Sequence, residues 1–120
     1  MDQAESPHPY DLEDRTLRFA KAVFAFVRTL PPSVANIEVS KQLVRSAGSV
    51  GANYIEATES LGKKDFLMKV KISRREAKES RYWLELVHSG PDEASAQERL
   101  INESVQLMKI FGAIVRNRQS

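Results

Sequence analysis

Apolar residues recur at intervals of three and four along most of the chain, the spacing that places side chains on one face of an α-helix. The clearest stretch follows Asp11, which suits an N-cap, and ends at Pro31-Pro32. Its apolar positions are Leu12, Phe19, Ala20, Val23, Phe26, Val27 and Leu30. No segment shows the strict alternation of a β-strand, so the pattern predicts an all-α chain.

Three further helices are predicted downstream. After a connecting segment from Ser33 to about Val39, a second helix runs to about Gly62, and a third runs from Lys63 to about Ser89. Gly90-Pro91-Asp92-Glu93 then combines a break with residues that favour a helix start, which opens a fourth. Because short connections make successive helices antiparallel neighbours, we expect an up-and-down antiparallel four-helix bundle over residues 11–118, after a flexible tail of residues 1–10.

Apolar faces are predicted on the second and fourth helices as well. The second helix carries Leu43, Val44, Ala47, Val50, Gly51, Tyr54 and Ile55. The fourth carries Ala94, Ile101, Val105, Met108, Phe111 and Val115, widened by Leu100, Leu107 and Ile114. Gly48 and Gly51 interrupt the second helix, where each glycine costs about 1 kcal/mol relative to alanine. We expect close packing of a neighbour such as Phe66 or Trp83 to offset that cost.

The third predicted helix has two apolar faces. A core face with small residues at its middle comprises Phe66, Val70, Ser73, Ala77, Ser80, Leu84 and Val87. A second face, turned by about 100–150° from the first, comprises Met68, Ile72, Trp83 and Leu86. Such a strip either covers a loop or marks a protein interface, and we favour an oligomer interface because large exposed apolar patches are rare on monomers.

The remaining sector of the third helix is basic. Its residues are Lys64, Lys71, Arg74, Arg75, Lys78 and Arg81. One interpretation is a solvated face in which Glu79 and Glu85 form ordinary pairs within the helix. The other is a nucleic-acid-binding surface that contacts phosphates without reading sequence. A net charge of only +2 with a pI near 9.0 is compatible with both.

Composition and motifs argue against an enzyme. The chain has no cysteine, and its histidines, His8 and His88, lack a carboxylate partner at catalytic or ligand spacing. Gly62-Lys63-Lys64 does not complete a phosphate loop, and the central helices lack the Glu-x-x-His pair of di-iron bundles. We therefore expect no catalytic residues, metal or cofactor. The absence of a signal peptide and of a membrane span predicts a cytoplasmic protein that does not contact a membrane.

Two stretches carry a family resemblance: residues 40–57, from Ser40 to Ala57, and residues 63–86, from Lys63 to Leu86. They resemble the bacterial four-helix-bundle family of 23S rRNA intervening-sequence (S23-like) proteins. The resemblance implies a left-handed bundle that assembles as a ring-shaped homopentamer. It also implies a relation to accessory proteins of diversity-generating retroelements, in which a basic pentamer engages nucleic acid and a reverse transcriptase.

Polar residues within these two stretches are assigned a structural role. Arg45, Asn53, Glu56, Glu76 and Glu79 are expected to bond between helices or between subunits, because charges near a core must be paired. The sequence thus predicts a non-catalytic homo-oligomer that binds an RNA or DNA backbone as an accessory factor. The alternative is a scaffold for protein assembly without a nucleic-acid role.

Overall fold

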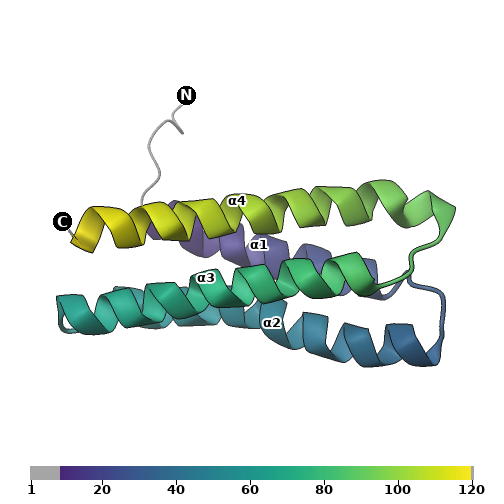
Figure 1. Cartoon of the computed structure of the whole chain (residues 1–120), viewed down its shortest axis with the longest axis horizontal. Helices are drawn as coiled ribbons and strands as arrows, with labels where there is room; N and C mark the ends of the chain where they lie inside the picture. Colours follow the sequence, from purple (N-terminus) through teal and green to yellow (C-terminus); the bar gives the residue numbers. More distant parts are fainter. Residues whose placement is uncertain (1–8, 120) are drawn as a thin grey trace.

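The structure is a computed structural model that describes residues 9–119. Four long helices run alternately up and down and pack against one another (Figure 1). They are α1 (Pro9–Val27), α2 (Val34–Thr58), α3 (Lys63–Leu86) and α4 (Ala94–Gln119), and a short 3-10 turn, η1 (Pro91–Glu93), precedes α4. Residues 9–119 contain no strand. The predicted all-α four-helix bundle is confirmed.

The first helix begins slightly earlier than the pattern predicts. α1 starts at Pro9, two residues before Asp11, and ends at Val27, before the expected end at Leu30. Proline suits the first turn of a helix because the amide hydrogen that it lacks would have no partner there. Residues 1–8 of the expected tail, including His8, lie outside the described part of the chain.

The connection predicted between Ser33 and Val39 is wrong, because α2 already begins at Val34. Ser33 is the N-cap, and its hydroxyl accepts a hydrogen bond of 3.0 Å from the backbone N–H of Asn36. Downstream, α2 ends at Thr58 and Gly62 is the N-cap of α3 rather than the end of α2. Residues 34–39 therefore extend α2 by more than one turn toward the end of α3.

Two amides secure the C-terminal end of α3. The buried Asn36 donates from Nδ2 to the carbonyl oxygens of Pro31 and His88, both at 2.8 Å, and accepts from the His88 N–H at 2.9 Å. From the other side, Gln97 of α4 donates to the carbonyl of Leu84 at 2.7 Å. The last turn of a helix leaves carbonyls without partners, and Gln97 supplies one to Leu84, while Asn36 holds the backbone at His88 just beyond the helix end. They fix where α3 stops relative to α2 and α4.

All four helices contribute to one core. The buried apolar residues are Leu12, Phe19, Val23, Phe26, Leu43, Ala47, Val50, Tyr54, Ala57, Val70, Ala77, Leu84, Val87, Leu100, Leu107, Phe111 and Val115. The core face predicted for α3 is confirmed from Val70 to Val87, whereas Phe66 is half-buried. Its serines are paired: Ser73 donates to the Val50 carbonyl at 2.9 Å, and the hydroxyls of Ser80 and Ser46 lie 2.9 Å apart.

The apolar face predicted for α4 includes all four buried apolar residues of the helix, Leu100, Leu107, Phe111 and Val115, but it is broader than the observed one. The buried positions are Leu100, Ser104, Leu107, Phe111 and Val115, whereas Ile101, Val105 and Met108 lie beside the core and Ala94 is exposed. The hydroxyl of Ser104 donates to the carbonyl of Ile101 at 2.6 Å, which satisfies it inside the core. Because Ser104 is polar, a search for apolar residues skips it, and the predicted face extends to the Ile101 and Met108 side of the buried row.

Gly51 marks a close helix contact, but with a different neighbour from the predicted Phe66 or Trp83. A Cβ at position 51 would lie 2.7 Å from Oγ1 of Thr16 on α1. Gly48, by contrast, has no heavy atom within 4 Å of a Cβ built there. Only one of the two glycines is therefore explained by packing within the bundle.

Candidate functional site

The six predicted basic residues of α3 are all exposed. Arg81 forms an ion pair with Glu85 at 3.4 Å, and Arg75 lies 3.8 Å from Glu76. The other four have no ion-pair partner among residues 9–119: Lys64, Lys71, Arg74 and Lys78. The side chains of these six residues share one sector of the helix surface, which we call the basic face. Because most of its charge is uncompensated locally, the basic face attracts anions.

The basic face continues onto α4 at Gly112, a feature that the sequence analysis missed. A Cβ at this buried glycine would lie 3.5 Å from a guanidinium nitrogen of Arg116 and 3.8 Å from Nε of Arg74. The two arginines, from adjacent helices, therefore cover the same position. Gly112 leaves room for them, and Arg116 extends the positive surface beyond α3.

The second apolar face of α3 is partly open to solvent. Met68 and Leu86 are 54% and 52% exposed, whereas Ile72 and Trp83 are half-buried and Trp83 also packs against the core. Tyr82, which the sequence analysis did not select, is 56% exposed and lies edge-on to the Trp83 ring, with centroids 5.0 Å apart. The face thus presents sulfur, aromatic and aliphatic groups, which are typical of protein contacts. We call Met68, Ile72, Trp83 and Leu86 the α3 apolar face.

Polar residues between α2 and α3 form two interhelical contacts. Arg45 pairs with Glu79 and lies 3.6 Å from the buried carboxylate of Glu76. Near the C-terminal end of α2, Glu56 accepts a hydrogen bond of 2.7 Å from Lys69 of α3. This hydrogen bond raises the pKa of the Lys69 ammonium. Both contacts help to set how α3 lies against α2.

Asn53 behaves differently from the other polar residues assigned a structural role. Its Nδ2 donates to the carbonyl of Ser49 in its own helix at 2.9 Å. The bond spans one turn, so it does not link α2 to another helix.

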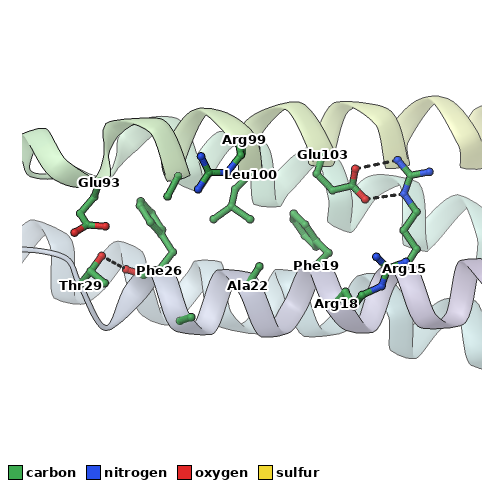
Figure 2. A pocket seen from close by; sticks show the side chains of 12 residues that line it. Arg15, Arg18, Phe19, Ala22, Phe26, Thr29, Glu93, Arg99, Leu100 and Glu103 are labelled. Atoms are coloured by element: carbon green, nitrogen blue, oxygen red, sulfur yellow. Dashed lines mark hydrogen bonds and ion pairs between the residues drawn. The ribbon is translucent and has the colours of Figure 1, made fainter.

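A groove of about 740 Å³ lies between α1 and α4 (Figure 2). Phe19 and Phe26 of α1 and Leu100 of α4 point into it. A bidentate pair closes one end, where Arg15 donates to the two carboxylate oxygens of Glu103 at 2.7 and 2.9 Å. The hydrogen bonds to Glu103 raise the pKa of the Arg15 guanidinium. No pattern in the sequence predicts the groove, because the groove depends on the distance between α1 and α4.

Within residues 9–119, no three His, Cys, Asp or Glu side chains gather in a way that would hold a metal ion. His88 is exposed, and its backbone is held by Asn36. Over the same residues, no helix combines the length and the apolar character needed to cross a membrane.

The fold defines the class of protein: an all-α four-helix bundle whose third helix carries an exposed basic face and a partly exposed apolar face. The helix pattern and the resemblance in residues 40–57 and 63–86 lead to one family. The chain belongs to the 23S rRNA-intervening sequence protein family, whose model matches residues 10–112. The relation to retroelement accessory proteins stays a prediction.

A solved structure is similar over nearly the whole chain. It is the crystal structure, at 1.70 Å resolution, of a protein of unknown function from the S23 ribosomal protein family of Bacteroides thetaiotaomicron. The two sequences are 30% identical, the match covers 87% of this chain and 97% of that chain, and the TM-score is 0.73. No curated protein matches significantly. Since the function of the solved relative is unknown, function must be argued from the residues of this chain.

Proposed function

We propose that this protein is a non-catalytic accessory factor that binds the phosphate backbone of RNA or DNA through the basic face of α3. The observation that carries the proposal is that four exposed cations share the basic face and have no ion-pair partner among residues 9–119: Lys64, Lys71, Arg74 and Lys78. Lysine and arginine on a regular helix neutralise phosphates and release condensed counterions. Such contacts position a nucleic acid without reading its bases, so we expect little sequence preference.

We further propose that the protein is a homo-oligomer assembled through the α3 apolar face, a pentamer as the family resemblance implies. The exposure of Met68 and Leu86 supports this, because burying both would remove an apolar strip from water. Several basic faces in one assembly would add weak phosphate contacts into a much higher avidity.

The test of nucleic-acid binding is the triple variant Lys71→Glu, Arg74→Glu and Lys78→Glu. Wild-type affinity for structured RNA or duplex DNA should fall steeply with salt, and the variant should not be retained at low salt. If three phosphate contacts are lost, the slope of log K against log salt should flatten by about 3. A salt titration by fluorescence anisotropy measures both quantities.

A matched control carries the same charge change elsewhere: Arg28→Glu, Lys41→Glu and Lys109→Glu, three exposed positions outside the basic face. It should keep most of the affinity, because net charge alone is not the proposed cause. Equal loss in both variants would contradict a defined face. If the wild type itself shows no salt-sensitive binding, the basic face is only solvated. The proposed function is then replaced by the alternative, a scaffold for protein assembly.

The oligomer is tested by Met68→Glu and Leu86→Glu, which place charges on the α3 apolar face. Sedimentation should show a defined oligomer for the wild type and dissociation for both variants, because burying an unpaired carboxylate is unfavourable. Val34→Glu is the control, since Val34 is 82% exposed at the start of α2. A wild-type monomer at tens of micromolar would overturn the proposal.

A further inference from the structure

A second exposed apolar surface lies on another side of the bundle, along the contact between α1 and α2. Leu17 and Phe24 on α1 are 51% and 39% exposed, and Ile37 and Ile55 on α2 are 51% and 50% exposed. Leu17 and Phe24 are seven residues apart and therefore share one side of α1. Ile37 and Ile55 are joined on one side of α2 by Val44 and Gly48, at helical spacings of four and seven residues.

The packing of Thr16 on Gly51 shows that these two rows border the same seam. Leu17 follows Thr16 directly, and Ile55 lies one turn beyond Gly51 on the same side of α2. The exposed groups of α1 and α2 therefore lie on the same side of the bundle, along the contact between the two helices. We call this surface the α1–α2 face: Leu17, Phe24, Ile37, Val44, Gly48 and Ile55.

Gly48 at the centre of the α1–α2 face has no explanation within one subunit. A glycine inside a helix costs about 1 kcal/mol relative to alanine. No neighbour requires it, since a Cβ there would meet no heavy atom within 4 Å. The missing side chain leaves the backbone of α2 open to approach from outside the subunit.

The α1–α2 face and the α3 apolar face match in length. From Ile37 to Ile55 and from Met68 to Leu86 the chain advances by the same number of residues, which spans about 27 Å of helix in each case. One face offers large, adaptable groups such as Met68 and Leu86, and the other offers a glycine between aliphatic side chains. Large side chains of one helix pack well into gaps left by small residues of another.

We infer that the α1–α2 face of one copy receives the α3 apolar face of a second copy. The inference rests on the proposed homo-oligomer and names the two surfaces that it joins. A two-fold dimer through the α3 apolar face would leave the α1–α2 face exposed, whereas a contact between unlike faces covers both on every subunit. The two faces lie on opposite sides of α2. The α1–α2 face is on the side where Gly51 packs against α1, and the α3 apolar face is on the side where Arg45 pairs with Glu79.

Because the faces lie on neighbouring sides of the bundle, each added copy is rotated relative to the one before. Repeated contacts of this kind close into a ring when the rotation divides a full turn. Faces on opposite sides of the bundle would instead extend a straight filament. The placement of the faces therefore favours a closed assembly.

Engineered cysteines test the contact directly, because the natural chain has none. Ile55→Cys is mixed with Met68→Cys in one sample and with Leu86→Cys in another. Each mixture is left to exchange subunits and is then oxidised. Using both partners covers the two possible directions of the helices. We expect a disulfide-linked dimer in at least one mixture and none from any variant alone. Gln106→Cys, exposed on α4, replaces Ile55→Cys in the control and should give no product.

The outcomes separate this inference from the proposed function. A dimer from Met68→Cys or Leu86→Cys alone would show like faces in contact and overturn the inference, while the homo-oligomer would stand. The same holds if sedimentation shows an oligomer but neither mixture gives a linked dimer. A wild-type monomer overturns both.

A second variant tests Gly48 without a cross-link. Gly48→Leu has room within the subunit and should keep its helical circular dichroism, yet sedimentation should show that it no longer assembles. Gln106→Leu adds the same side chain at an exposed position of α4 and should assemble normally. Normal assembly of Gly48→Leu would place the contact elsewhere.

Discussion

Replacing Asn36 with alanine is expected to lower the free energy of unfolding by about 2–3 kcal/mol. The amide makes three hydrogen bonds, to the carbonyls of Pro31 and His88 and from the N–H of His88, at 2.8 to 2.9 Å. Asn36 is only 4% exposed, so water cannot readily replace these bonds. The loss should also free the C-terminal end of α3. Chemical denaturation at fixed protein concentration measures the change.

The control for Asn36 is Asn102→Ala, which removes the same amide from an exposed position of α4. Its effect should stay within about 0.5 kcal/mol. Equal effects of the two substitutions would contradict a special role for Asn36. A third variant, Gln97→Ala, should destabilise in the same direction, because Gln97 donates to the Leu84 carbonyl at the same helix end.

Gly51→Leu is expected to destabilise the bundle by about 1–3 kcal/mol through overpacking. Its Cβ alone would lie 2.7 Å from Oγ1 and 3.1 Å from Cβ of Thr16. Thr16 has little freedom to move, because it is 1% exposed and its hydroxyl donates to the Leu12 carbonyl at 2.9 Å. α1 would have to separate from α2. Thermal melts measure the resulting loss.

Alanine substitutions at the two glycines of α2 should have opposite signs. Within one subunit, Gly48→Ala meets no neighbour, and in the unassembled protein it should stabilise α2 by up to about 1 kcal/mol. Gly51→Ala gains the same helix propensity, but its Cβ would clash with Thr16, so the substitution should destabilise the bundle. Stabilisation by both would mean that the contact between α1 and α2 adapts easily.

Helical periodicity was sufficient to predict the four helices and to sort the faces of α3. The direction of each side chain on a regular helix follows from spacing alone. The burial of Val70, Ala77 and Leu84 and the exposure of the basic residues could therefore both be predicted. The α4 face was predicted with its four buried apolar residues but too broadly, because Ser104 occupies a buried position that a search for apolar residues skips. The Ser33 cap was missed because the adjacent prolines suggested a longer break.

Contacts that join distant parts of the chain could not be predicted in this way. Asn36 bonds to His88, 52 residues later, and Arg74 and Arg116 both lie over Gly112 because α3 and α4 pack against each other. Such contacts depend on the separation and rotation of whole helices, which periodicity does not determine. The groove between α1 and α4 was missed for the same reason.

The limited packing of α1 against α4 connects the local opening of α1 with the association of subunits. α1 packs on α2 but meets α4 over a shorter stretch, with the groove between them. The element with the least packing support opens first in native-state fluctuations, so backbone amides of α1 should exchange with deuterium faster than those of α3. Leu17 and Phe24 belong to the α1–α2 face, so a docked second copy would hold α1 closed. By mass action, protection of the α1 amides should then rise with protein concentration.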